Sequence, residues 1–181
     1  VPNGSHAISA VARDSSGNAT TSTSVPITVA NTVSNGLVAA YNFNENTGTA
    51  VSDKTSNSNN GTIFQATWFA AGKFGTALQF DGTNDYVTIP DSNSLDLTNS
   101  MTLEAWVRPT STSGWRTVLL KENSSELAYA LYSRESTNRP SAWIRTNPTS
   151  GSSKSTAGTT GLTLNTWTHL AATYDGATLK M

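Results

Sequence analysis

The chain of 181 residues contains no cysteine. This absence excludes a disulfide framework, a thiolate zinc site and a thiol nucleophile. Charge is also scarce, because 13% of the residues are charged and the net charge is -1. The few Lys and Arg residues are scattered, so the sequence has no basic patch of the kind that binds nucleic acid. We therefore expect no nucleic-acid partner.

Long apolar runs and amphipathic helical patterns are missing as well. No apolar segment is long enough to cross a membrane, so we expect no membrane insertion. The chain begins at Val1 rather than at a methionine, and we expect any signal peptide to lie upstream. The residues that dominate are Thr, Ser, Asn and Gly, with 36% hydrophobic residues. This mixture favours short strands joined by turns and predicts an all-β protein.

Residues 1–30 form a first unit in the pattern. Apolar and polar residues alternate over residues 6–12 and 21–29, on either side of a turn cluster, which predicts a β-hairpin. Residues 3–18 closely resemble the closing strands of bacterial extracellular immunoglobulin-like repeats. The resemblance implies that this hairpin is the C-terminal part of such a domain.

The composition changes after this hairpin. Residues 31–36 are polar and end in an Asn-Gly turn signal, so we expect a linker there. Residues 37–181 then form the second predicted domain. We expect its strands at residues 37–43, 61–63, 101–107, 117–121, 127–133, 141–145 and 167–174, and a long mobile loop at residues 147–161.

Residues 77–90 predict a β-hairpin at the centre of this domain. Two alternating runs flank a loop rich in Asp, Gly and Asn, and these residues favour tight turns. Leu78 and Phe80 would share one face with Val87 and Ile89. In residues 101–107 the alternation places Met101, Leu103, Ala105 and Val107 on one face and Thr102, Glu104 and Trp106 on the other. We expect Leu95 and Leu97 to tuck under the sheet.

Several ordered motifs carry a family resemblance. They are GKFGTALQFDG at residues 72–82, YVTIP at 86–90, MTLEAWVRP at 101–109 and WTHLAATYDG at 167–176. From residue 37 to the end, the chain resembles a laminin-G-like jelly roll of the concanavalin A-like lectin and glucanase superfamily. The resemblance implies an antiparallel β-sandwich of two sheets packed face to face. Family members continue past the strand that begins at Thr178, so we expect this sandwich to be C-terminally incomplete.

Catalytic signatures are absent from the pattern. Glucanases of the superfamily carry closely spaced acids on one strand, but Glu104 has no acidic neighbour, and Glu122 and Glu126 flank a turn. His6 and His169 lie in different predicted domains and have no third zinc ligand in view. We therefore expect a domain that is not an enzyme.

An oxygen-rich loop is the candidate metal site. Calcium binds carboxylate, amide and backbone oxygens, and Asp53, Asn57 and Asn59 offer such oxygens at close spacing. Asp81, at the mouth of the predicted central hairpin, is a further candidate ligand. Laminin-G-like relatives often bind calcium at the rim of the sandwich, which the resemblance implies here in outline. The alternative is that these residues only form Asx turns.

The candidate ligand-binding residues are solvent-side aromatics with a polar neighbour. Sugars present apolar ring faces and directional hydroxyls, and Trp115, Tyr132, Trp143 and Arg145 lie in or beside loops with suitable partners. Trp106 and Trp167 lie within strong strand patterns and are expected in the core or in sheet packing.

The sequence therefore predicts a non-catalytic extracellular binding module, secreted or on a bacterial cell surface. Its expected ligand is a polysaccharide or glycoconjugate, as in cell adhesion. Two alternatives remain open: a structural spacer in an adhesin-type repeat protein, and an accessory module of a polysaccharide-degrading enzyme.

Overall fold

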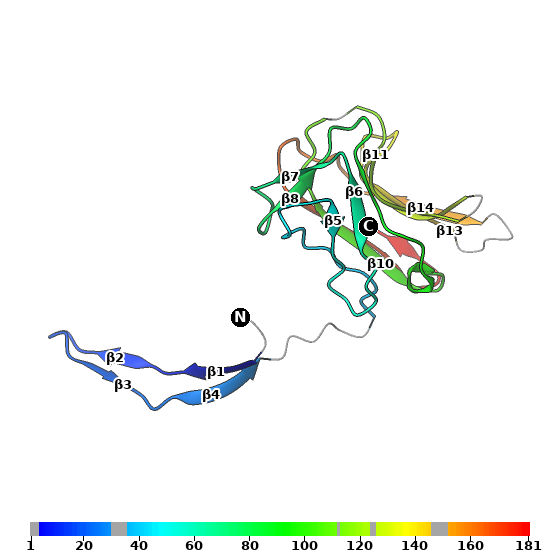
Figure 1. The fold of residues 1–181 in the computed structure, drawn as a ribbon. Coiled ribbons are helices and arrows are strands. Elements are labelled where there is room, and N and C mark those ends of the chain that lie inside the picture. The colour runs from blue at the N-terminus through cyan, green and yellow to red at the C-terminus, as the bar shows by residue number, and fades with distance from the viewer. Residues whose placement is uncertain (1–3, 30–35, 112, 124–125, 146–151) are drawn as a thin grey trace. The chain divides into compact units, whose positions relative to one another are not determined.

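The structure is a computed structural model that describes residues 4–29, 36–111, 113–123, 126–145 and 152–181. The chain divides into two compact units, Val1–Val38 and Ala39–Met181. Each unit is described by itself (Figure 1). In the described part of the chain, no helix has the length and apolar character needed to span a membrane.

The first unit is a two-stranded ribbon, shown in blue in Figure 1. Its strands are β1 (Gly4–Ile8), β2 (Val11–Arg13), β3 (Ala19–Thr21) and β4 (Val25–Val29). β1 pairs with β4 and β2 pairs with β3, both antiparallel. The Asp14 carboxylate shapes the turn by accepting hydrogen bonds from the backbone N–H groups of Ser16 and Asn18, each at 2.9 Å. The predicted hairpin is therefore confirmed.

The second unit is built on two larger antiparallel sheets. One sheet has the order β10-β15-β16 and the other has the order β11-β12-β13-β14. Their strands are β10 (Met101–Val107), β11 (Arg116–Glu122), β12 (Leu127–Arg134), β13 (Ser141–Arg145), β14 (Ser153–Ala157), β15 (Thr168–Tyr174) and β16 (Leu179–Lys180). The strand predictions for residues 101–107 and 141–145 match β10 and β13, and those for β11, β12 and β15 are right to within one residue at each end.

The core lies between these two sheets. Its buried residues come from β10, β12, β13 and β15, and they are Met101, Leu103, Tyr129, Leu131, Ala142, Ile144, Leu170, Ala172 and Tyr174. Ala105 and Val107 pack against this cluster, so the inward face predicted for β10 is confirmed. Leu97 also packs against it, as predicted. Two sheets joined by one apolar layer form a β-sandwich, in agreement with the predicted fold class.

Smaller sheets and one short helix complete the unit. One sheet has the order β5-β6-β9 and another pairs β7 with β8. These elements are β5 (Ala50–Val51), β6 (Gly61–Phe64), β7 (Thr67–Phe69), β8 (Ala77–Gln79), β9 (Tyr86–Thr88) and the 3₁₀-helix η1 (Asn93–Leu95).

The predicted central hairpin is wrong in its pairing. β8 and β9 are both present, but β8 pairs with β7 and β9 pairs with β6. The loop between them is closed by Asp81, whose backbone N–H donates to Asp85 Oδ2 at 2.8 Å. This local bond turns the chain without aligning the two strands as neighbours. Phe80, expected on a buried face, is 48% exposed.

Two further expectations are corrected. Residues 37–43 are all described and form no strand, and the Ala40 N–H donates to the Asp53 side chain rather than to a sheet neighbour. Part of the predicted loop at residues 147–161 is the strand β14, which pairs with β13 from Ser141 opposite Ala157 to Arg145 opposite Ser153. Residues 147–151 of that loop lie outside the described residues.

Candidate ligand-binding site

Three of the four predicted ligand residues lie on one face of the β11–β14 sheet. Ala142 and Ile144 of β13 point into the core, so the alternating Trp143 and Arg145 point to the opposite, outer face. Tyr132 lies directly opposite Ser141 across β12 and β13, and opposed residues of an antiparallel pair share a face. The strand alternation therefore brings Tyr132, Trp143 and Arg145 onto one surface.

The fourth predicted residue, Trp115, reaches the same surface through Tyr132. The two rings meet edge to face, with centroids 5.0 Å apart and an interplanar angle of 80°. Trp115 remains 49% exposed, so part of its ring is open to solvent. Burial, followed by the charge of Glu122, raises the pKa of the Tyr132 phenol, which therefore stays protonated at neutral pH and can donate a hydrogen bond.

Trp143 and Arg145 line one small cavity of about 200 Å³, together with Leu127, Ile144 and Ser153. The Arg145 guanidinium makes an ion pair with Glu126 at the rim of the sheet. The Trp143 Nε1–H is buried, and no residue in the described part of the chain accepts a hydrogen bond from it. The indole of Trp143, with its N–H donor, and the guanidinium of Arg145 thus lie at one cavity.

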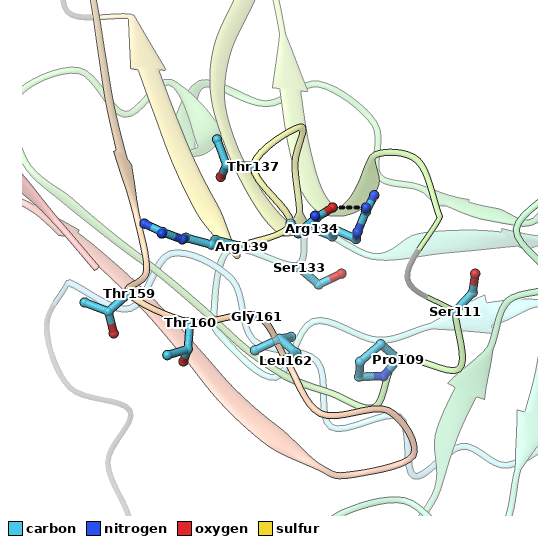
Figure 2. Close-up of a pocket in the computed structure, with 11 residues that line it drawn as sticks. Pro109, Ser111, Ser133, Arg134, Thr137, Arg139, Thr159, Thr160, Gly161 and Leu162 are labelled. Carbon is cyan, nitrogen blue, oxygen red and sulfur yellow. Dashed lines mark hydrogen bonds between the residues drawn. The ribbon is translucent and has the colours of Figure 1, made fainter.

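A larger cavity of about 560 Å³ lies near the other end of β12 (Figure 2). It lies between the turn that follows β12, the segment that precedes β15 and the loop that follows β10. Its lining residues are Pro109, Ser111, Ser133, Arg134, Thr137, Asn138, Arg139, Thr159, Thr160, Gly161 and Leu162. The sequence interpretation missed this cavity because its lining comes from three separate segments.

Arg134 is fixed at the edge of this cavity. Its Nη1 donates to the Gly114 carbonyl at 2.6 Å, and its Nη2 donates to Asn138 Oδ1, the bond drawn in Figure 2. The Arg134 Nε–H is buried and has no acceptor among the described residues. The guanidinium is therefore held in place with a donor to spare.

The predicted metal loop is organised around the buried Asp53 carboxylate. Oδ1 accepts hydrogen bonds from the backbone N–H groups of Ala40 at 3.0 Å and Thr55 at 2.9 Å. Oδ2 accepts bonds from the Thr55 hydroxyl at 2.7 Å and the Asn59 N–H at 3.0 Å. Burial raises the pKa of Asp53, but these hydrogen bonds outweigh it, and the pKa lies below its ordinary value.

The other predicted metal ligands are also engaged in protein contacts. The Asn59 side chain exchanges hydrogen bonds with the Ser94 hydroxyl, and the Asn57 N–H donates to Thr55 Oγ1 at 3.2 Å. Asp81 is exposed and accepts a bond from the Thr83 N–H at 2.7 Å. Within the described ranges no three His, Cys, Asp or Glu side chains gather at a point. The calcium site stays a prediction, and a cation at Asp53 would compete with four hydrogen bonds.

The comparisons with known proteins bear on the second unit. Residues 81–181 match the laminin-G-like family model described as the concanavalin A-like lectin/glucanases superfamily. This match covers more than half of the chain. The chain belongs to this superfamily. No curated protein and no solved structure matched it.

In this superfamily member, the candidate acids Glu104 and Glu126 each lie beside a basic side chain. Glu104 lies on the outer face of β10, 3.4 Å from His169 Nε2 on the neighbouring strand. Both side chains are largely exposed, at 61% for Glu104 and 41% for His169. Glu126 is paired with Arg145. Glu104 is therefore a surface carboxylate, and His169 is a histidine on the same face of the sheet.

Trp106 lies outside the buried core of the superfamily member and packs on the outer face of its sheet, which is the second of the two positions expected for it. It is 41% exposed and meets Phe74 edge to face at 5.6 Å, while Lys73 Nζ lies 4.7 Å from its ring centroid. The alternation of β10 had already placed Trp106 on the face opposite the inward residues. Arg134 and Arg139 were missed, although two arginines around one short polar turn are a readable signal.

Proposed function

We propose that the chain is a non-catalytic extracellular binding module whose ligand is a polysaccharide or glycoconjugate. One observation carries this proposal: Trp115, Tyr132, Trp143 and Arg145 share the outer face of the β11–β14 sheet. Exposed aromatic rings pack against the apolar faces of sugars, and nearby polar groups bind the hydroxyls. The superfamily includes lectins, which agrees with this role.

The non-catalytic part of the proposal rests on the carboxylates. Glycoside hydrolysis requires two carboxyl groups across the scissile bond, one of which must be protonated to act as an acid. Glu126 lies near the proposed surface, but its carboxylate is paired with Arg145. We therefore expect binding of glycans without cleavage.

A glycan array with the full chain tests the proposal. Trp115→Ala and Trp143→Ala should each lower the affinity for any retained glycan by about tenfold, because a stacked aromatic contributes on the order of 1–2 kcal/mol. Trp106→Ala is the matched control, since Trp106 is similarly exposed but lies on the other sheet. Equal losses in all three variants, or no retained glycan, would contradict the proposal. Release of reducing ends from a bound glycan would contradict the non-catalytic part.

A further inference from the structure

We propose that the 560 Å³ cavity beside Arg134 binds the anionic group of an acidic sugar, a carboxylate or a sulfate. This inference deepens the proposed function, on which it rests, by naming the class of glycan. It starts from charge. Arg134 and Arg139 both line the cavity, and no Asp or Glu is among its lining residues.

Arg134 is half-buried and Arg139 is exposed, and among the described residues neither is paired with an acid, unlike two other cations of the unit. Lys121 is paired with Asp91 and Asp96, and Arg145 is paired with Glu126. In contrast, no acidic group of the described residues lies within 4.0 Å of Arg134 or Arg139. Two uncompensated guanidinium groups at one cavity create a local positive potential, although the net charge of the chain is -1.

The acid nearest in sequence is turned away from the cavity. Glu135 follows Arg134 directly, but its side chain is not part of the lining and the residue is only 7% exposed. Its carboxylate accepts a hydrogen bond from the Thr137 hydroxyl at 2.5 Å. Glu135 therefore holds the turn together rather than neutralising the cavity.

The turn also fixes the Arg134 guanidinium and the backbone of Arg139. The Glu135 N–H donates to the Arg139 carbonyl and the Asn138 N–H donates to the Glu135 carbonyl, each at 3.0 Å. Asn138 adopts a φ of 66°, a conformation that asparagine tolerates better than most residues. Its side chain accepts from Arg134 Nη2. A guanidinium fixed in this way loses little freedom on binding, which favours recognition of planar or tetrahedral oxyanions.

Arg134 also has an unused donor. Its buried Nε–H has no acceptor in the described part of the protein, and a buried donor without a partner is costly. An anionic oxygen at the cavity edge would accept from it, and charge-assisted hydrogen bonds of this kind are stronger than neutral ones.

The rest of the lining suits the body of a sugar. Hydroxyl groups come from Ser111, Ser133, Thr137, Thr159 and Thr160, and apolar contact comes from Pro109 and Leu162. The volume lies within the range of ~300–1,000 Å³ found for small-molecule sites. Several hydroxyls with an apolar patch match the two-sided character of a sugar ring.

The residues of the cavity also lie close along the chain to the proposed sugar-binding face, which is the outer face of the β11–β14 sheet. Arg134 lies two residues after Tyr132 on β12, and its Nη1 bonds the carbonyl of Gly114, the residue before Trp115. The Trp115 and Tyr132 pair and the cavity are therefore neighbours on β12 and on the segment that precedes β11. One acidic sugar could occupy the cavity while its neighbour in the glycan contacts Trp115.

The test uses matched pairs of probes that differ only in the anionic group. Polygalacturonate is compared with its fully methyl-esterified form, and dextran sulfate is compared with dextran, by calorimetry with the full chain. We expect at least about tenfold tighter binding to one or both anionic members. Preference within the first pair identifies a carboxylate, and preference within the second identifies a sulfate. Arg139→Gln should remove most of that preference, whereas Arg13→Gln, in the first unit, should leave it unchanged.

Arg139→Gln is the primary variant because Arg134 also supports the turn, so that Arg134→Gln would weaken the fold as well. Arg139→Lys retains the charge and should restore part of the preference for the anionic probes. Equal binding to both members of each pair would overturn this inference and leave the proposed function intact. Binding to no probe and to no glycan on the array would overturn both. A preference that Arg139→Gln leaves unchanged, or that Arg13→Gln lowers equally, would show general charge attraction and would also overturn the inference.

Discussion

Trp106 and His169 face each other across β10 and β15, with ring centroids 5.2 Å apart and ring planes inclined by 36°. Phe74, from the loop that precedes β8, meets the same indole edge to face at 5.6 Å. The outer face of this sheet is therefore joined to a distant loop by an aromatic contact. This contact lies on the sheet opposite to the proposed sugar-binding face, so its role can be measured separately.

The Trp106 and Phe74 pair should contribute to stability as a coupled unit. We expect a coupling energy of about 0.5–1.5 kcal/mol between Trp106→Ala and Phe74→Ala in a double-mutant cycle, because edge-to-face rings attract beyond their buried area. The free energies of unfolding in urea give the measurement. As a control, Phe64→Ala, in a different sheet, should be additive with Trp106→Ala. If the effects of Trp106→Ala and Phe74→Ala were additive, the ring contact would contribute no coupling energy, which would contradict this prediction.

Asp53 should be a stability switch at acidic pH. Burial raises the pKa of Asp53, but the hydrogen bonds from Thr55, Ala40 and Asn59 lower it by a larger amount. The pKa in the folded state therefore lies below the unfolded value of 3.8. The resulting stabilisation is present above about pH 4 and is lost as the pH falls through the folded pKa. Asp53→Asn should cost about 2–4 kcal/mol at pH 7, since an amide cannot accept all four bonds. It should cost less near pH 3, and an equal cost at both pH values would contradict the account.

The effect of added calcium on stability distinguishes the two interpretations of the Asp53 loop, a calcium site or a set of Asx turns. Since both carboxylate oxygens already accept two hydrogen bonds each, we expect the difference in thermal midpoint between wild type and Asp53→Asn to be the same with and without millimolar calcium. A calcium ligand would instead give a midpoint that rises with calcium in the wild type alone. That second result would support the metal site predicted from Asp53, Asn57, Asn59 and Asp81.

Gly61 should tolerate no side chain. A Cβ added at this position would lie 2.8 Å from Val51 Cγ2 and 2.9 Å from Val87 Cγ1, both in the β5-β6-β9 sheet. Gly61→Ala should therefore destabilise the unit by about 1–3 kcal/mol through overpacking. Thr62→Ala, at the neighbouring exposed position, serves as the control and should change stability by less than about 1 kcal/mol. A neutral Gly61→Ala would show that the sheet can relax around the added methyl group.

Local pattern predicted the large strands well. In β10, strict alternation from Met101 to Val107 followed by Pro109 defines both the inward face and the end of the strand. The same reasoning located β12 and β13 to within one residue at each end. These features depend on neighbours in sequence, so the sequence alone can specify them.

Strand partners and loop cavities were not predictable in this way. The turn residues between β8 and β9 are typical of a hairpin, but each strand finds more favourable pairing elsewhere, with β7 and β6. Such pairing depends on packing between distant segments, which alternation does not encode. For the same reason the Arg134 cavity was missed, since Pro109, Arg139 and Thr160 come together only after folding.

The register of β10 against β15 has a consequence for biosynthesis. Met101 lies opposite Tyr174, and all four strands of the β11–β14 sheet are translated between these two residues. That sheet joins neighbours along the chain and can form early, whereas β10 must wait for a partner made much later. Until then the apolar side chains of Met101 and Leu103 have no partner strand beside them. A nascent chain paused before residue 168 should therefore be the species most prone to aggregate and most dependent on chaperones.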